Sequence, residues 1–138
     1  ELIDITIDGK PLQVPQGTTV YQAAKKIGIE IPIFCYHDRM PPFGACRMCL
    51  VQVEKMPKLQ ASCTLMATPG MNITTQSQMA IDGRKEILEL LLINHPLDCP
   101  ICDRGGECPL QDNALKYGPG LSRFFEEKRH FKKALPLG

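Results

Sequence analysis

The sequence of 138 residues lacks the features that would place it in a membrane or on a nucleic acid. Its longest apolar run, residues 87–93, is interrupted by a glutamate and is far shorter than the roughly 20 residues that cross a bilayer. Its 16 basic and 15 acidic side chains nearly cancel, so no overall charge attracts nucleic acid or an anionic surface. We therefore expect no direct membrane insertion and no nucleic-acid partner.

Motifs of substrate chemistry are also missing. The sequence contains no phosphate-cradling glycine-rich loop behind a strand, no dinucleotide-binding fingerprint and no serine nucleophile elbow. We therefore expect no catalytic site for a substrate in this chain alone, and no binding of a dinucleotide or flavin by it.

Cysteine, by contrast, is abundant. The sequence contains seven cysteines, an odd number, and no secretory signal precedes them. Both observations disfavour a disulfide framework and predict reduced thiols in a cytosolic or matrix-like compartment. The sequence begins with Glu1 rather than methionine, and we expect it to be a piece of a longer protein.

The first four cysteines follow one another at gaps of ten, two and thirteen residues. Four thiolates can hold one [2Fe-2S] cluster, although the plant-type ferredoxin spacing has a shorter first gap of four residues. Gly44 and the small Ala45 allow the backbone to curl closely and to aim amide N–H groups at sulfur. The candidate ligands are Cys35, Cys46, Cys49 and Cys63.

A small sheet is predicted around these cysteines. Isoleucines alternate with polar residues over 3–8, and a turn at 8–11 leads to a second strand, which predicts an opening hairpin. Thr19 and Gln22 form a capping box for a helix that ends at Gly28. The chain then returns through strands predicted at residues 50–53, 59–63 and 71–74. This order is that of a β-grasp ferredoxin-like domain of the α+β class, in which a four-stranded sheet and one helix bury a small core. We place this domain at residues 1–76.

A helical, loop-rich segment is predicted at residues 77–120. Ser77 can cap a helix that ends before Pro96, because proline disfavours helical geometry in the residue before it. One imidazole and three thiols follow at gaps of three, two and five residues, on a loop rich in proline and glycine. The last thiol opens a helix that reaches Tyr117, and the helix dipole there favours a thiolate. One face of the helix capped by Ser77 is predicted to consist of Ile81, Arg84, Leu88 and Leu91. The candidate ligands in the loop that follows are His95, Cys99, Cys102 and Cys108.

Together the two motifs resemble the large iron-sulfur subunit of respiratory complex I, the NADH:quinone oxidoreductase. The resemblance covers nearly the whole chain, including Gly44-Ala-Cys46-Arg-Met-Cys49 and His95-Pro-Leu-Asp-Cys99-Pro. It implies a [2Fe-2S] cluster on the first four cysteines and a [4Fe-4S] cluster on His95 and the last three. It also implies a relay that takes electrons from NADH and flavin toward quinone.

The resemblance has further implications for partners and location. The expected partners are a flavin- and NADH-binding subunit and further iron-sulfur subunits. The expected location is the peripheral arm of a membrane complex, on the cytoplasmic side of the inner membrane or the matrix side of mitochondria. NAD-linked and iron-only hydrogenases and NAD-linked formate dehydrogenases contain the same module, and a relay in one of them is the alternative hypothesis.

This chain departs from the resembled family in its extent. It stops before further cysteine clusters and a large molybdopterin-oxidoreductase-like domain. Residues 121–138 are therefore interpreted as a charged linker or as the start of a missing domain, and the relay is expected to be incomplete.

Simpler interpretations remain for each motif. A zinc ribbon would separate its cysteine pairs by about 15–20 residues, whereas 49 residues intervene here. Two separate zinc sites suit the same ligand types, which leaves a structural zinc module as a third hypothesis. A thiol redox switch needs a cysteine pair at the start of a helix after a buried strand, a context that neither pair clearly has. His95 could instead stabilise the end of the preceding helix as a weak cation.

Overall fold

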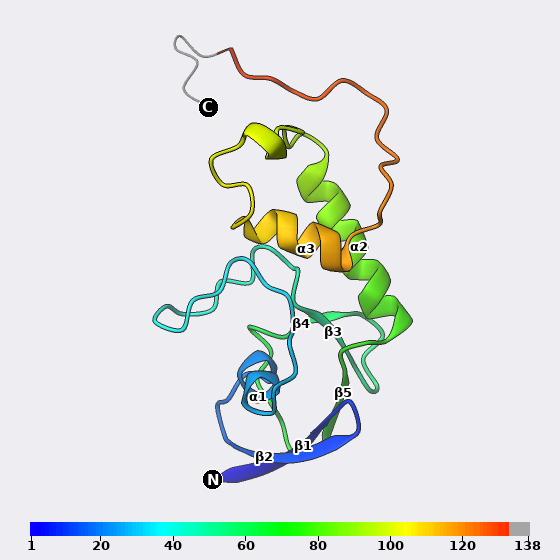
Figure 1. Ribbon diagram of the computed structural model, residues 1–138. Coiled ribbons are helices and arrows are strands. Elements are labelled where there is room, and N and C mark those ends of the chain that lie inside the picture. The colour runs from blue at the N-terminus through cyan, green and yellow to red at the C-terminus, as the bar shows by residue number, and fades with distance from the viewer. Residues whose placement is uncertain (133–138) are drawn as a thin grey trace.

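The chain opens with a β-hairpin whose alternating isoleucines face the core (Figure 1). In this computed structural model, which describes residues 1–132, β1 (Leu2–Ile7) pairs antiparallel with β2 (Lys10–Pro15). Asp8 and Gly9 both have positive φ, at 49° and 77°, which matches the twist of a two-residue hairpin turn. The predicted hairpin is confirmed.

Helix α1 (Val20–Lys26) covers one face of the sheet. The predicted capping box is present, because the Thr19 hydroxyl accepts from the Gln22 N–H while the Gln22 side chain accepts from the Thr19 N–H. The buried face of the helix consists of Val20, Ala23 and Ala24, whose small side chains allow a close approach to the sheet.

The sheet is mixed, and all five predicted strand segments join it, so that it has one strand more than the four-stranded sheet expected for the domain. Its order is β2-β1-β5-β3-β4, with β3 at Leu50–Val53, β4 at Gln60–Ala61 and β5 at Met71–Thr74. The β1–β5 pair is parallel and the other pairs are antiparallel. The strand expected over 59–63 is limited to two residues, since the Thr64 and Leu65 N–H groups both donate to the Ala61 carbonyl and turn the chain.

Ile73 lies at the centre of this sheet, and its replacement tests the core. Its side chain is fully buried, and it pairs with Ile7 on one side and Val53 on the other. We expect Ile73→Ala to lower the free energy of unfolding by about 2–5 kcal/mol, because it leaves a cavity. Urea denaturation measures this loss. The control is Asn72→Ala, which changes the exposed residue next to Ile73. Equal losses for the two variants would contradict this core.

Helix α2 (Gln78–Leu92) begins at the predicted cap, where the Ser77 hydroxyl accepts from the Ala80 N–H. Its buried positions are Ala80, Arg84 and Leu88. Leu91, which we placed on the same stripe, is 42% exposed, because the sheet contacts only the first turns of the helix. The predicted stripe is therefore wrong at its last position.

The rest of the described chain packs near α2. A 3-10 turn, η1 (Cys99–Ile101), leads to α3 (Pro109–Tyr117), which begins and ends where the sequence predicted and crosses α2 (Figure 1). Within residues 1–132 the elements are thus a mixed sheet and three α-helices, which confirms an α+β fold. None of the helices in this range is both long and apolar enough to cross a membrane.

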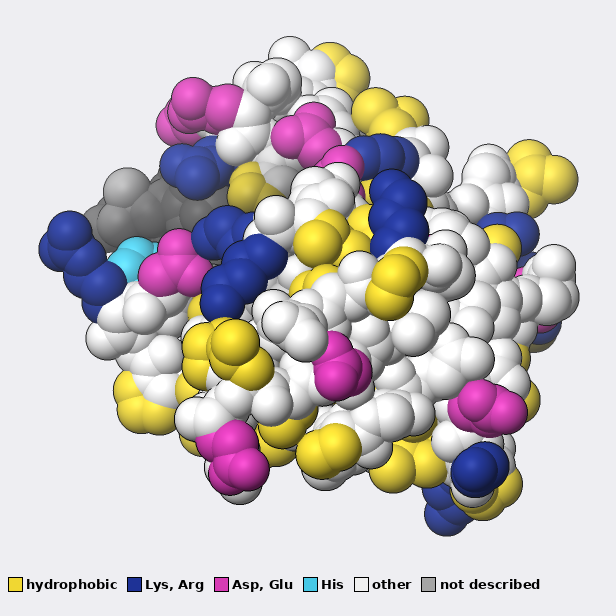
Figure 2. Space-filling model, turned by 90° about the horizontal axis from the view of Figure 1, so that it is seen from below, with side chains coloured by type: hydrophobic (Ala, Val, Ile, Leu, Met, Phe, Trp, Pro, Cys, Tyr) yellow, Lys and Arg dark blue, Asp and Glu magenta, His cyan; other side chains and the backbone are white. Residues whose placement is uncertain are grey.

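The segment after α3 runs back along α2. Arg123 pairs with Glu89 at 2.6 Å, and the Lys128 ammonium donates to the Leu92 and Ile93 carbonyls at 2.8 and 3.0 Å. The last part of the predicted linker, residues 133–138, lies outside the described residues. On the face seen in Figure 2, side chains of both charge signs are interspersed with apolar ones.

Candidate metal centres

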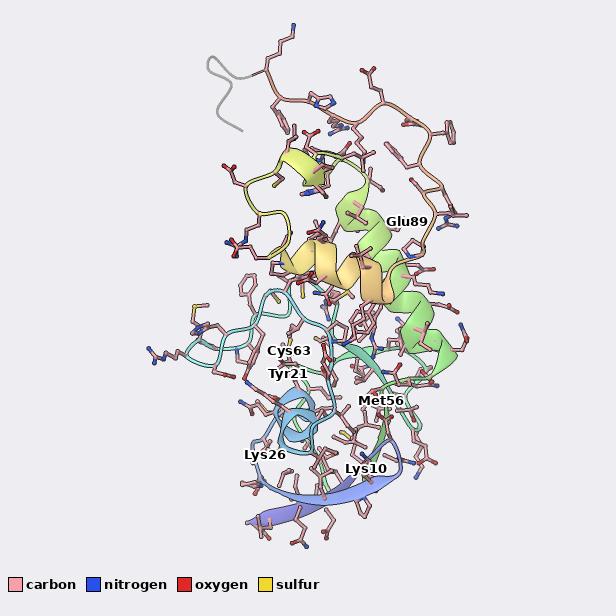
Figure 3. All side chains as sticks on the ribbon, in the orientation of Figure 1. Lys10, Tyr21, Lys26, Met56, Cys63 and Glu89 are labelled. Atoms are coloured by element: carbon pink, nitrogen blue, oxygen red, sulfur yellow. The ribbon has the colours of Figure 1, made fainter. Side chains whose placement is uncertain are left out.

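The first four cysteines come from three parts of the fold. Cys35 and Cys46 lie on the long loop that joins α1 to β3 and extends away from the sheet (Figure 1). Cys49 ends this loop directly before β3, and Cys63 lies on the turn after β4. Cys49 and Cys63 are each 1% exposed, and Figure 3 shows Cys63 between α1 and the helices above it. Cys35 and Cys46 are partly exposed.

Cys35 and Cys46 form one pair. The Cys46 N–H donates to the Cys35 sulfur at 3.4 Å. Burial acts to raise the pKa of the Cys35 thiol, but hydrogen bonds from the Cys46 N–H, the Cys46 thiol and the Ala45 N–H together lower it. Donors that point at a sulfur stabilise its thiolate, so this part of the loop is prepared for a metal-bound sulfur.

Cys49 and Cys63 form the second pair. Burial, the charge of Cys49, a hydrogen bond to Cys49 and the charges of Cys35 and Cys46 together raise the pKa of the Cys63 thiol to about 12. All four thiols therefore lie within electrostatic reach of one another. Four neighbouring thiolates need a compensating cation, so metal binding at this site would release protons.

The backbone around these pairs is closely packed. Gly44 has a φ of +68°, which favours glycine, and a Cβ there would lie 3.0 Å from the Thr64 Cγ2 atom. Both the backbone conformation and the close packing therefore favour glycine at this position. Met48 is fully buried between the ligand positions. The Ser62 N–H and hydroxyl both donate to the Cys49 carbonyl, at 3.1 and 2.8 Å. These contacts fix Cys49 against the turn that carries Cys63.

The four thiols interact as two pairs, Cys35 with Cys46 and Cys49 with Cys63. A [2Fe-2S] cluster takes two protein ligands on each iron, whereas a tetrahedral zinc site takes four ligands at one centre. Within residues 1–132, no group of three or more His, Cys, Asp or Glu side chains is placed as a single metal ion would need.

The second motif spans the end of α2 and the start of α3. Cys99 begins the η1 turn and Cys102 follows it, and the Cys102 N–H donates to the Cys99 carbonyl at 3.4 Å. Gly105 closes the loop, and a Cβ there would lie 2.6 Å from the Cys99 carbonyl oxygen, so the tight wrapping needs glycine. Cys108 is the N-cap of α3, as predicted. Cys99 and Cys102 are exposed and Cys108 is partly exposed.

His95 lies just beyond α2, where its backbone N–H donates to the Leu92 carbonyl at 3.2 Å. Its side chain is exposed. The Lys128 ammonium, rather than the His95 imidazole, bonds the last carbonyls of α2. His95 and the three cysteines all lie on the segment between the end of α2 and the start of α3, but within the described residues their side chains are not gathered around one point.

Comparison with known families gives two adjacent matches. Residues 1–78 match the family model described as a 2Fe-2S iron-sulfur cluster binding domain. The chain belongs to this family. Residues 84–123 match the NADH-ubiquinone oxidoreductase-G iron-sulfur binding region. Each of the two cysteine motifs therefore lies inside an iron-sulfur match of its own.

Individual proteins similar to this 2Fe-2S family member also have iron-sulfur or oxidoreductase names. A Rickettsia bellii protein named as a subunit of NADH-quinone oxidoreductase is 56% identical over 95% of this chain and 19% of its own length. The mitochondrial NADH dehydrogenase [ubiquinone] iron-sulfur protein 1 of Solanum tuberosum is 52% identical over 94% of this chain and 18% of its own length. The chain therefore spans about a fifth of the length of these curated relatives.

A solved structure is also similar. The crystal structure of an NAD+-reducing [NiFe]-hydrogenase in the H2-reduced state has a TM-score of 0.78 and 32% sequence identity. The match covers 92% of this chain and 55% of the hydrogenase chain.

Several residues around the sites were missed by the sequence analysis. The Ser62 hydroxyl bonds the Cys49 carbonyl, and Met48 is fully buried next to Cys49 in the sequence. Nothing in the local sequence distinguishes either residue from other small polar or apolar residues. Lys116 of α3 pairs with Glu30 at 2.6 Å, just before Cys35. Both side chains of this ion pair are largely exposed, so it orients the two segments more than it stabilises them.

Proposed function

We propose that the chain is the iron-sulfur region of an electron-transfer subunit of a multisubunit NADH:quinone oxidoreductase. In this role it relays electrons from NADH and flavin toward quinone and has no substrate site of its own. The observation that carries the proposal is the succession of the two iron-sulfur family matches in one chain, each over a complete set of candidate ligands.

The first cluster site is proposed to lie in a β-grasp domain of residues 1–76. The four thiols would hold a [2Fe-2S] cluster, with Cys35 and Cys46 on one iron and Cys49 and Cys63 on the other. The hydrogen bonds within each pair support this division. When bound, the cluster supplies one-electron redox chemistry. The chain's own contribution is burial of Cys49 and Cys63 and donation of N–H groups to Cys35, which stabilise sulfur charge and exclude water.

The second site is proposed to lie in residues 77–120. His95, Cys99, Cys102 and Cys108 would hold a [4Fe-4S] cluster, with His95 neutral. Two observations support His95 as a ligand: it follows α2 at the end that also carries the cysteine loop, and Lys128 already bonds the helix carbonyls. The N-terminus of α3 would stabilise the Cys108 thiolate.

The surface of the C-terminal third supports burial against other proteins or other parts of a longer chain. From Leu90 onward several large apolar side chains are exposed, and a cluster of such side chains is typical of an interaction surface. We propose that flavin-binding and further iron-sulfur subunits, together with the linker or missing domain after residue 120, cover this region in the peripheral arm of the complex. That arm would lie on the cytoplasmic side of the inner membrane, or on the matrix side in mitochondria. The exposed residues include Leu90, Leu97, Ile101, Leu115, Leu121, Phe125 and Phe131.

A relay in an NAD-linked hydrogenase is the second candidate, and the similar hydrogenase structure favours it. Its identity of 32% is well below the 56% of the oxidoreductase relative, so we place it second. Electron-transfer assays on the complex that contains the full-length protein separate the two. NADH-dependent quinone reduction without hydrogen-dependent NAD+ reduction is expected.

The metal content of anaerobically purified protein tests the central claim. We expect about six irons and about six acid-labile sulfides per chain, because one [2Fe-2S] and one [4Fe-4S] cluster together contain these numbers. Electron paramagnetic resonance after dithionite reduction is expected to give two distinct signals. About two zinc ions per chain without sulfide would contradict the proposal and leave a structural zinc module.

A further inference from the structure

Arg84 is a charged side chain in the interior of the protein. It lies on α2, is 1% exposed and points toward the strand that follows Cys49. One terminal nitrogen donates to the Leu50 carbonyl at 3.2 Å and to the Thr75 carbonyl at 2.5 Å. Its Nε atom is buried and has no hydrogen-bond partner among the described residues.

The contacts of Arg84 satisfy some of its donors but do not neutralise its charge. Both of its acceptors are uncharged carbonyls, and the ion pairs found in residues 1–132 involve Lys25, Lys116 and Arg123 instead. A guanidinium remains protonated in proteins. A buried cation without a paired anion is costly, so its retention here calls for a nearby negative charge.

Three groups around Arg84 can carry negative charge. Burial lowers the pKa of Arg84, while the charges of Tyr117, Asp8 and Cys49 act to raise it. The Asp8 carboxylate accepts from the Thr75 N–H at 2.7 Å and from the Thr75 hydroxyl. The Cys49 thiol is another of the three groups, and Leu50, whose carbonyl Arg84 holds, is the next residue in the chain.

These contacts form a continuous connection from the hairpin turn to the cluster loop. The Asp8 carboxylate accepts from the Thr75 N–H, and the Thr75 carbonyl accepts from the Arg84 guanidinium. The same guanidinium nitrogen donates to the Leu50 carbonyl. On the other side of Cys49, Ser62 holds its carbonyl. The ligand is therefore fixed from both directions, and the fixed charge of Arg84 comes from the helix that begins the second cluster segment.

We propose that Arg84 is a positioning residue for the first cluster, which holds the backbone behind Cys49 and uses its buried charge to favour the reduced state. This inference rests on the proposed [2Fe-2S] site. Reduction adds one electron and therefore one negative charge near Cys49, and no proton is needed for the balance. A fixed buried cation stabilises the added charge and raises the reduction potential, and salt screens it little because it is remote from solvent.

A redox titration of the protein with both clusters bound tests this role. Dithionite supplies the electrons, and electron paramagnetic resonance follows each cluster separately. In Arg84→Met, which keeps most of the side-chain length but not the charge, we expect the midpoint potential of the first cluster to shift to more negative values. The signal of the second cluster, whose ligands lie on other elements, serves as an internal reference.

Two further variants separate charge from packing. Arg84→Lys keeps a cation and is expected to keep a potential nearer to wild type, even where thermal stability falls. Lys85→Met removes the same charge from the next residue of α2, which is exposed, and is expected to leave both potentials unchanged. If Arg84→Met does not assemble, Arg84→Gln, which can still donate to a carbonyl, takes its place.

The outcomes distinguish this inference from the proposed function. A protein that contains both clusters but whose first potential is the same in wild type, Arg84→Met and Arg84→Lys overturns the role of Arg84 and leaves the relay intact. Equal shifts in the methionine and lysine variants also overturn it, because packing and not charge would then be responsible. Absence of iron and sulfide from the wild-type protein would instead reject the proposed function itself.

Discussion

Replacing Cys63 by serine is expected to remove the first cluster and to leave the second in place. The iron content should fall from about six to about four per chain, since a [2Fe-2S] cluster contains two irons. Serine is a poor substitute because the buried site depends on a soft thiolate, and Cys63 pairs directly with Cys49 in the interior. Iron and sulfide analysis together with electron paramagnetic resonance measures the loss.

The control for this variant is Thr64→Ser, which changes an exposed residue on the same turn. It should retain about six irons and both signals, as expected for two intact clusters. Loss of both signals in Cys63→Ser would mean that the two sites assemble together rather than independently. Retention of both signals would exclude Cys63 as a ligand.

The parts of the fold that the sequence predicted well are those with local signals. The hairpin depends on alternating isoleucines and on Asp8 and Gly9, which accept positive φ angles next to one another. The first helix depends on Thr19 and Gln22, three residues apart. In each case the residues that decide the structure are neighbours in the chain, so no knowledge of the tertiary fold was needed.

The parts that the sequence could not predict depend on distant contacts. The parallel pairing of β1 with β5 joins residues more than sixty positions apart, and no local pattern specifies it. The turn at Cys63 is held next to Cys49 because the Ser62 hydroxyl donates to the carbonyl of Cys49, thirteen residues earlier. The β-forming residues at 59–63 do not indicate that the chain leaves the sheet at Cys63 and places its thiol next to Cys49.

The candidate sites show the same division. The proposed ligands were chosen from their spacing, since cysteines at short gaps have few alternative uses, and the two family matches cover both sets. The charge environment did not, although one signal was available: Arg84 occupies a position on an otherwise apolar helix stripe, and its burial is now evident. A cation at such a position indicates either that this face of the helix is exposed to solvent or that the cation is buried and has a function. Only the packing of α2 on β3 distinguishes the two cases.

Replacing His95 by cysteine is expected to keep the second cluster and to lower its reduction potential. The proposed ligand set has three thiolates and one neutral imidazole, and a fourth thiolate adds a negative charge next to the iron. Histidine ligation raises potentials in Rieske centres for the same reason. Iron should remain at about six per chain, and a redox titration followed by electron paramagnetic resonance should show a negative shift in the second cluster alone.

Removing the side chain altogether should have the larger effect. In His95→Ala we expect the second cluster to be lost or to become labile, so that iron falls toward about two per chain, the content of the remaining [2Fe-2S] site. His37→Ala is the matched control, because His37 is also exposed and its Nδ1 only accepts from the Arg39 N–H at 3.1 Å. If the alanine variants at the two histidines kept the same iron content and potentials, His95 would not be a ligand. The three cysteines of its loop would then need a fourth partner from solvent or from another chain, which is chemically feasible because Cys99 and Cys102 are exposed.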